Sequence, residues 1–190
     1  MKVARTRMEG VLLIEPAVFP DERGLFMEAW SRERYAREGV DADFVQDNVS
    51  LSRRHVLRGL HFQNPVPQGK LVSVLRGEVW DVVVDLRRGS PTFAEWEGFT
   101  LREQGSQLYV PPGFAHGFVV TSDAALFSYK CTAPYSPPHE RSLRWNDPDV
   151  GIAWPVDAPV LSEKDAAAPL LRDLPAGALF AGAEAGAVTA

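Results

Sequence analysis

The chain of 190 residues contains very few of the residues that cross-link a fold or hold a metal ion. Its one cysteine, Cys131, cannot form an intrachain disulfide and cannot supply the several thiolates of a cysteine-based zinc site. Only four histidines occur, and none of them lies two or four positions from another. The sequence therefore offers no closely spaced pair of imidazoles of the kind that binds metal on one element.

Long hydrophobic runs and clusters of positive charge are also missing. The apolar stretches, for example residues 11–14 and 166–171, fall far short of the ~20 residues that cross a bilayer. With 20 Lys and Arg against 25 Asp and Glu, the net charge is −5, and no five basic residues follow one another. We therefore expect no membrane span and no nucleic-acid partner. Residues 1–10 lack the apolar stretch of a secretory signal, so we expect a cytoplasmic protein.

The residues that are present indicate a globular protein made mostly of β-strands. Hydrophobic residues make up 45% of the chain, an ordinary value for a folded domain, whereas 15 Gly and 15 Pro predict many turns. Residues 79–86 alternate as a strand does, with Trp80, Val82 and Val84 on one face and Asp81 on the other. We expect further strands at residues 11–14, 25–30, 71–75, 108–110, 118–120 and 126–131, and a helix at residues 31–38.

The spacing of these segments predicts the architecture. Strands about ten residues apart, with Gly and Pro between them, are typical of a β-sandwich or barrel. We expect residues 1–171 to form a single domain with a few short helices. Residues 172–190 are rich in Ala and Gly with little to anchor them, so we expect a flexible C-terminal tail there.

Two histidines lie in segments that indicate a functional site. In residues 59–63 (GLHFQ), His61 and Gln63 share a face if the segment is a strand. Residues 111–117 (PPGFAHG) have the form P-x-G-x-x-H, which in cupin β-barrels is a turn that delivers a histidine, here His116, into the barrel mouth. The purely structural alternative for either histidine is a half-buried side chain that is hydrogen-bonded to the backbone.

The usual metal site of a cupin needs an H-x-H pair, and the corresponding residues here read His61-Phe62-Gln63. The missing second histidine disfavours a metal-dependent cupin oxygenase. No G-x-G-x-x-G loop follows a predicted strand either. We therefore expect neither a metal nor another cofactor.

Without a metal, the polar residues suggest acid–base chemistry. The pKa of histidine lies near neutral pH, as a general base requires. Lys70 and Arg58 can stabilise negative charge on substrate oxygens. Tyr129 alternates onto one face of its strand, and spacing alone favours a core aromatic residue with a solvent-exposed hydroxyl. Asp165 reads equally as a solvated charge near a helix start. The residues alone predict a small β-barrel with a polar mouth.

Taken together, the motifs resemble those of the dTDP-4-dehydrorhamnose 3,5-epimerase family, a metal-independent branch of the cupins. The resemblance extends in collinear order over residues 11–171. It implies a cupin-type jelly-roll β-barrel. The matching stretches are DERG (21–24), FVQDNVS (44–50), LRGLHFQ (57–63), QGKLV (68–72), GEVWDVVVDL (77–86), GSPTF (89–93), YVPPGFAHGF (109–118), YKC (129–131), WND (145–147) and LSEKD (161–165).

The chemistry of that family explains the residue types. Its substrate is a dTDP-linked 4-keto-6-deoxyhexose, in which the C4 ketone acidifies the protons on C3 and C5. The resemblance implies that His61 is the base, that Asp165 supports it as a dyad, that Tyr129 returns a proton from the opposite face, and that Lys70 stabilises the enolate. Tyr135 matches an aromatic residue that stacks on the thymine base. The other implied substrate-binding residues are Arg23, Glu28, Gln46, Asp47, Asn48, Arg58, His116, Glu140 and Lys164.

Three alternatives remain at this point. The first reading is C3 and C5 epimerisation in dTDP-L-rhamnose biosynthesis. The second is a C3- or C5-only epimerase of a dTDP-4-keto-deoxysugar from a secondary-metabolite pathway, and the third, from another class, is a non-catalytic sugar-binding cupin. A binder needs no paired acid and base, which argues against the third. The resemblance also implies a homodimer that pairs through its β-sheets.

Overall fold

The computed structural model describes residues 1–181, so most of the expected C-terminal tail, residues 182–190, lies outside the described residues. The described chain forms two antiparallel sheets and a separate hairpin. In spatial order, the six-stranded sheet contains β1 (Lys2–Arg5), β2 (Leu12–Glu15), β10 (Gln107–Val110), β7 (Lys70–Arg76), β12 (Ala124–Cys131) and β5 (Gln46–Arg53). The five-stranded sheet contains β13 (Glu140–Ser142), β6 (Leu57–Gln63), β11 (Phe114–Val120), β8 (Glu78–Asp85) and β9 (Trp96–Arg102).

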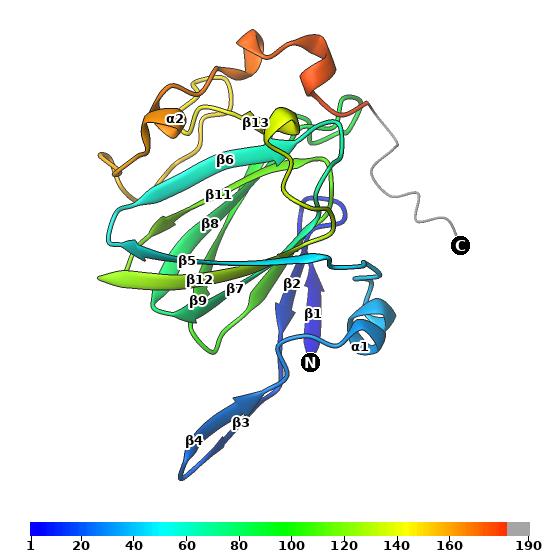
Figure 1. Ribbon diagram of the computed structural model, residues 1–190, viewed down its shortest axis with the longest axis vertical. Coiled ribbons are helices and arrows are strands. Elements are labelled where there is room, and N and C mark those ends of the chain that lie inside the picture. The colour runs from blue at the N-terminus through cyan, green and yellow to red at the C-terminus, as the bar shows by residue number, and fades with distance from the viewer. Residues whose placement is uncertain (182–190) are drawn as a thin grey trace.

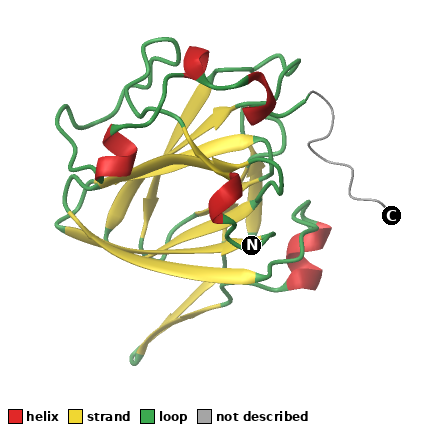
Figure 2. Cartoon of the chain, turned by 45° about the horizontal axis from the view of Figure 1, so that its top comes forward, coloured by secondary structure: helices red, strands yellow, loops and turns green. Residues whose placement is uncertain are grey.

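The two sheets face each other as the layers of a jelly roll (Figure 2). This arrangement confirms the expected mostly β, cupin-type barrel. The helices are short: α1 (Arg32–Arg37), α2 (Glu163–Ala166), and the 3₁₀ turns η1 (Pro137–His139), η2 (Leu171–Asp173) and η3 (Ala176–Ala178). Among the described residues, none of these helices is long and apolar enough to cross a membrane.

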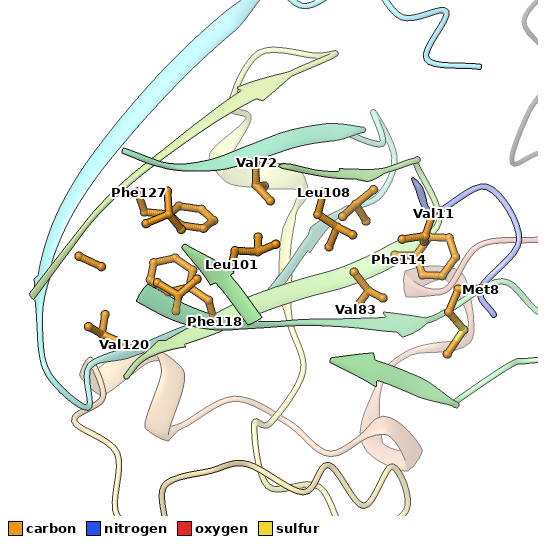
Figure 3. Packing of buried hydrophobic residues seen from close by; sticks show 14 residues of the cluster. Met8, Val11, Val72, Val83, Leu101, Leu108, Phe114, Phe118, Val120 and Phe127 are labelled. Atoms are coloured by element: carbon orange, nitrogen blue, oxygen red, sulfur yellow. The ribbon is translucent and has the colours of Figure 1, made fainter. Parts of the chain in front are cut away.

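Alternation along the strands fills the space between the sheets. Val83 of β8 and Phe118 of β11 point inward from one sheet, and Val72 of β7 and Phe127 of β12 point inward from the other (Figure 3). The rings of Phe118 and Phe127 stack with their centroids 4.1 Å apart, so the two layers meet directly. Burial of such side chains supplies ~25 cal/mol per Å² of apolar area, which holds the sheets together at this end of the barrel.

The opposite face of the five-stranded sheet is covered by the C-terminal part of the chain. Leu174, Ala178 and Leu179 are buried there against Phe62 and Val84. The domain prediction placed residues 172–181 in a flexible tail, but these residues pack on the sheet. The Asn64 side chain donates to the carbonyl oxygens of residues 177–179 at 3.1 to 3.3 Å, which explains how an Ala/Gly-rich segment is anchored.

One hairpin lies apart from both sheets. Strands β3 (Val18–Asp21) and β4 (Gly24–Met27) pair only with each other and project from the body of the barrel (Figure 1). Phe19 and Phe26 stand on this hairpin with 60% and 69% of their surfaces exposed. Exposed aromatic residues on a projecting hairpin indicate a surface that meets another molecule.

A buried ion pair closes the other end of β8. Asp85 is fully buried, and both of its oxygens accept hydrogen bonds from Arg87, at 2.9 and 2.7 Å. Ser90 and Thr92 donate to the same carboxylate at 2.6 and 2.7 Å. Burial disfavours the charged carboxylate, but these hydrogen bonds outweigh burial and lower the pKa of Asp85. The Gly89–Phe93 turn is therefore ordered by an ionised aspartate.

Candidate active site

The inner faces of the two sheets enclose a polar cleft at the end of the barrel where β6 and β12 lie opposite each other. It has adjoining lobes of about 660 and 280 Å³. Five residues line both lobes: Asn48, His61, Lys70, Tyr129 and Glu140. The strand alternation expected for residues 61–63 is confirmed, because His61 and Gln63 face the cleft while Phe62 packs in the outer cluster.

His61 is held by a carboxylate that lies 104 positions away in the sequence. Its Nε2 is 2.6 Å from Oδ1 of Asp165, whose side chain is 5% exposed. Ser162 caps the short helix α2 by accepting a bond from the Asp165 amide at 3.1 Å, which fixes the carboxylate toward β6. Burial disfavours the charged carboxylate, but hydrogen bonds from His61 and Ser162 outweigh burial and lower the pKa of Asp165.

The ionised aspartate sets the tautomer of His61. A carboxylate accepts a hydrogen bond from Nε2–H, so the neutral imidazole keeps Nδ1 free of a proton. A histidine in this state can accept a proton from a ligand in the cleft. The contact brings together the two residues for which the resemblance implies a dyad.

His116 lies directly opposite His61 on the neighbouring strand β11. Its Nε2 is 2.9 Å from each oxygen of Asp81, which is completely buried on β8. The two strands approach closely here because Gly59 faces Gly117, and a Cβ at Gly59 would lie 2.6 Å from the Cα of Gly117. Asp81 was absent from the expected site. Its signal in the sequence is a charged residue in the middle of a strand, with apolar residues on both sides of it.

Lys70 and Tyr129 come from the opposite sheet. They lie on the adjacent strands β7 and β12, where Lys70 pairs in register with Cys131, two positions from Tyr129. Burial lowers the pKa of Lys70, and Asp81 and Glu140 are among the charges that oppose this shift. Burial raises the pKa of Tyr129, so its phenol keeps its proton at neutral pH. The cleft therefore has the imidazole of His61 on one wall and a protonated phenol, Tyr129, on the other.

A chain of polar contacts crosses the mouth of the cleft. Tyr135 donates to Oε2 of Glu140 at 3.0 Å, and Lys164 donates to Oε1 of the same carboxylate at 2.6 Å. Burial disfavours the charged form of Glu140, but these two bonds outweigh burial and lower its pKa. The hydrogen bond to Glu140 raises the pKa of Tyr135. Tyr135 is 51% exposed, so its ring presents a face to solvent at the mouth.

Strand β5 brings two of the three expected residues into the cleft. Gln46 and Asn48 line it and are joined by a hydrogen bond of 3.0 Å. Asp47 lies between them, so alternation turns it to the other face of the sheet, where it accepts from Lys130 at 2.9 Å. Asp47 therefore does not line the cleft of its own chain.

Arg58 enters the larger lobe from β6. Its Nε donates to Oγ of Ser52 at 2.9 Å, which holds the guanidinium across from β5. Besides Asp47, the expected residues that the described chain does not bring to this cleft are Arg23 and Glu28. Arg23 sits at the tip of the β3–β4 hairpin paired with Asp21, and Glu28 follows β4 and pairs with Arg34 at 3.3 Å.

The donor set of the cleft does not match a metal centre. Within residues 1–181, no three His, Cys, Asp or Glu side chains come together as ligands for one ion. In both His61 and His116, the ring nitrogen Nε2 lies against a carboxylate of the protein. What the cleft offers is an imidazole paired with a carboxylate, a phenol and cationic side chains around a space of about 660 Å³.

Comparisons with known proteins agree with this geometry. The family model described as dTDP-4-dehydrorhamnose 3,5-epimerase matches residues 5–173. The dTDP-4-dehydrorhamnose 3,5-epimerase of Pseudomonas aeruginosa is 53% identical over 168 residues, covering 87% of this chain and 93% of the relative.

Two solved structures extend the comparison to three dimensions. The dTDP-6-deoxy-D-glucose-3,5-epimerase of Legionella pneumophila, solved with dTDP-4-keto-L-rhamnose, has a TM-score of 0.92 and 48% identity, covering 95% of this chain and 97% of that one. A 3'-monoepimerase from Streptomyces bikiniensis, solved with dTDP-quinovose, has a TM-score of 0.82 and 38% identity, covering 88% and 86%. With this coverage and identity, the chain belongs to the dTDP-4-dehydrorhamnose 3,5-epimerase family.

Proposed function

We propose that this protein is an isomerase that inverts C3 and C5 of dTDP-4-dehydro-6-deoxy-D-glucose and so forms dTDP-4-dehydro-L-rhamnose. The observation that carries the proposal is the placement of base and acid on opposite walls of one cleft. His61 with Asp165 stands on the five-stranded sheet, and Tyr129 stands on the six-stranded sheet. Inversion at a carbon requires that a proton leave from one face and return to the other, which this placement allows.

The proposed reaction begins with proton transfer to His61. The C–H bond next to the C4 ketone breaks, its proton goes to Nδ1 of His61, and its electron pair forms an enolate. Asp165 stabilises the imidazolium through Nε2. The ammonium of Lys70 stabilises the enolate oxygen, a role that a cation in a water-poor cleft performs well.

Reprotonation completes the inversion. The enolate collapses to the ketone as carbon takes the phenolic proton of Tyr129 from the opposite face. The raised pKa of Tyr129 keeps that proton available at neutral pH. The tyrosinate regains a proton from solvent and His61 loses one to solvent, so the protein returns to its starting state and the cycle repeats at the second carbon.

Binding follows from the charges around the same cleft. We assign Arg58 and Lys164 to the diphosphate and neighbouring oxygens, and Tyr135 to stacking on the thymine base. His116, held by Asp81, lies across from His61 and contacts the sugar ring in this proposal. Gln46, Asn48 and Glu140 supply further polar contacts along the cleft.

The proposal includes a homodimer. Arg23 and Glu28 lie on or beside the β3–β4 hairpin. This hairpin projects from its own barrel (Figure 1), and its Phe19 and Phe26 are exposed. Strand β5 is a sheet edge, and Val49 and Leu51 on its outer face are 61% and 71% exposed. A hairpin that adds to this edge in a second copy covers apolar surface and brings Arg23 and Glu28 toward the partner's cleft. We also propose a cytoplasmic location, which the single free cysteine suits.

A one-centre epimerase is the second candidate, because the similar monoepimerase shows that this fold also performs inversion at one carbon. One experiment separates the candidates. The protein is incubated with dTDP-4-dehydro-6-deoxy-D-glucose in deuterated water, and deuterium at C3 and C5 is counted by mass spectrometry and NMR. We expect deuterium at both carbons. Deuterium at one carbon supports a monoepimerase, and none at either carbon contradicts an epimerase.

A further inference from the structure

The loop that carries Tyr135 is held by glutamine side chains from three separate places in the chain. Residues 132–136 (TAPYS) leave β12 and cross the mouth of the cleft without helix or strand structure. A loop of this kind is ordinarily the most mobile part of a fold. Here, however, its backbone groups are bonded one after another by Gln68, Gln63 and Gln46.

Gln63 makes the central contacts. It is 3% exposed, and its amide nitrogen donates to the carbonyl oxygens of Pro134 at 3.3 Å and Val66 at 3.0 Å. Its oxygen accepts from the backbone amide of Ser136 at 2.8 Å. Both N–H groups of Gln63 are thus used within the protein, which leaves no donor for a ligand.

The two other glutamines hold the loop on either side. Gln68 donates to the carbonyl oxygen of Ala133 at 2.7 Å. Gln46 accepts from the backbone amide of Tyr135 at 2.7 Å. The carbonyl groups of residues 133 and 134 and the amide groups of residues 135 and 136 are therefore each paired with a side chain.

The ring that this loop presents is half exposed, although its hydroxyl is bonded to the protein. Tyr135 is 51% exposed, and its hydroxyl is fixed by Glu140 at 3.0 Å. An aromatic ring that is fixed in place but uncovered has already lost the freedom that binding would otherwise remove. The ring is thus prepared to stack on a flat group.

We propose that Gln63, Gln68 and Gln46 form a clamp that pre-organises the Tyr135 loop for stacking on a nucleobase, and that Gln63 and Gln68 are positioning residues for nucleotide affinity. The inference rests on the proposed function, because it takes thymine as the stacked base. It goes beyond that function by assigning affinity to side chains that act on the loop backbone and not on the substrate. Stacking on an aromatic side chain changes affinity by about 5- to 150-fold, so the position of this ring matters.

The test measures binding of dTDP, without a sugar, by isothermal titration calorimetry. Gln63→Leu removes three hydrogen bonds, two of them to the loop, at nearly constant volume. We expect the Kd for dTDP to rise by about tenfold and the KM for the sugar nucleotide to rise with it, while kcat falls less. Gln107→Leu is the matched control. Gln107 is 2% exposed and makes three hydrogen bonds, to Tyr35, Ala29 and Ser73, away from the cleft. The Gln107→Leu variant should have a lower Tm and an unchanged Kd for dTDP.

A double-mutant cycle identifies the ring as the group through which the clamp acts. Tyr135→Ala should weaken dTDP binding strongly in the parent and only slightly in Gln63→Leu, because the ring is already misplaced there. A Kd for Gln63→Leu within about twofold of the parent, or equal effects of Tyr135→Ala in both backgrounds, would overturn the clamp.

Two further outcomes are distinguishable. If Gln63→Leu does not fold, Gln68→Ala removes a single contact from a half-buried residue, and its Kd should rise by about threefold. An unchanged Kd for Gln68→Ala would then overturn the proposal. If the parent itself does not bind dTDP, the nucleotide site of the proposed function is wrong, and the clamp is wrong with it.

Discussion

Both carboxylate oxygens of Asp81 lie 2.9 Å from Nε2 of His116, in a site that excludes solvent from the aspartate completely. His116 lines the cleft and Asp81 lies behind it, so the aspartate acts through its neighbours. Burial raises the pKa of Asp81, and the contacts with His116 and Lys70 oppose that shift. Its carboxylate is in turn one of the groups that raise the pKa of Lys70 against the effect of burial. A single buried carboxylate thus fixes one cleft residue and supports the charge of another.

Asp81→Asn should therefore move the pH dependence of turnover. Without the negative charge, the pKa of Lys70 falls further, and less of the lysine is protonated as pH rises. We expect kcat to fall about tenfold at neutral pH, less than the ~10²–10⁴ for loss of a base itself, and the alkaline limb of the kcat profile to shift to lower pH. A variant with a lower Tm but an unmoved alkaline limb would show that Asp81 is only structural.

The sequence predicts the parts of the fold in which one face of an element is apolar. The alternation at residues 79–86 matches β8, and the helix expected at residues 31–38 matches α1. Strand β5 was missed because its sequence, QDNVSLSR, has polar residues toward the cleft and apolar residues toward the outside. A strand that lines an active site breaks the pattern by which strands are found.

The site was harder to predict than the fold, and contacts between distant segments explain why. His61 and Asp165 are 104 positions apart, and only the packing of α2 on β6 brings them together. The family resemblance supplied that pairing, and spacing alone does not. It also placed Asp47 in the site, whereas alternation along β5 turns that side chain away.

Tyr129→Phe should separate proton removal from inversion. Phenylalanine keeps the ring packed beside Phe127 and loses only the hydroxyl. His61 can still remove a proton, and water can return one to the same face. We expect epimerised product to fall much more than solvent deuterium exchange at C3 or C5, measured in one sample by NMR. Equal loss of both with the fold intact would mean that Tyr129 acts before reprotonation.

Asp85→Asn should lower stability without touching the chemistry. Removing one partner of a buried ion pair costs about 3–5 kcal/mol, here because Arg87 is left without its counter-charge. The pKa of Asp85 is lowered in the folded protein. Its contribution to the free energy of unfolding is therefore complete above the unfolded-state pKa of ~3.9, and it is lost as pH falls through the folded-state pKa.

The difference in free energy of unfolding between parent and Asp85→Asn should thus be largest at neutral pH and should narrow below about pH 4. Urea titrations at several pH values measure it. Turnover at 20 °C or below, where the variant stays folded, should remain within about twofold of the parent. A difference that grows on acidification would contradict an ionised Asp85 in the folded protein.

Mixed dimers test whether Arg23 serves the partner's cleft. Arg23→Ala and His61→Asn should each be nearly inactive alone, His61→Asn by ~10²–10⁴ because an amide cannot accept the proton. If each active site joins His61 of one copy to Arg23 of the other, a mixed dimer contains one intact site and one doubly altered site. Co-refolding equal amounts should then restore about one quarter of parental activity, since random pairing makes half of the dimers mixed.

The matched control combines His61→Asn with Asp165→Asn, which lie in the same cleft of one chain and should restore nothing. Activity that stays at the level of the separate Arg23→Ala and His61→Asn proteins would place Arg23 outside the partner's site.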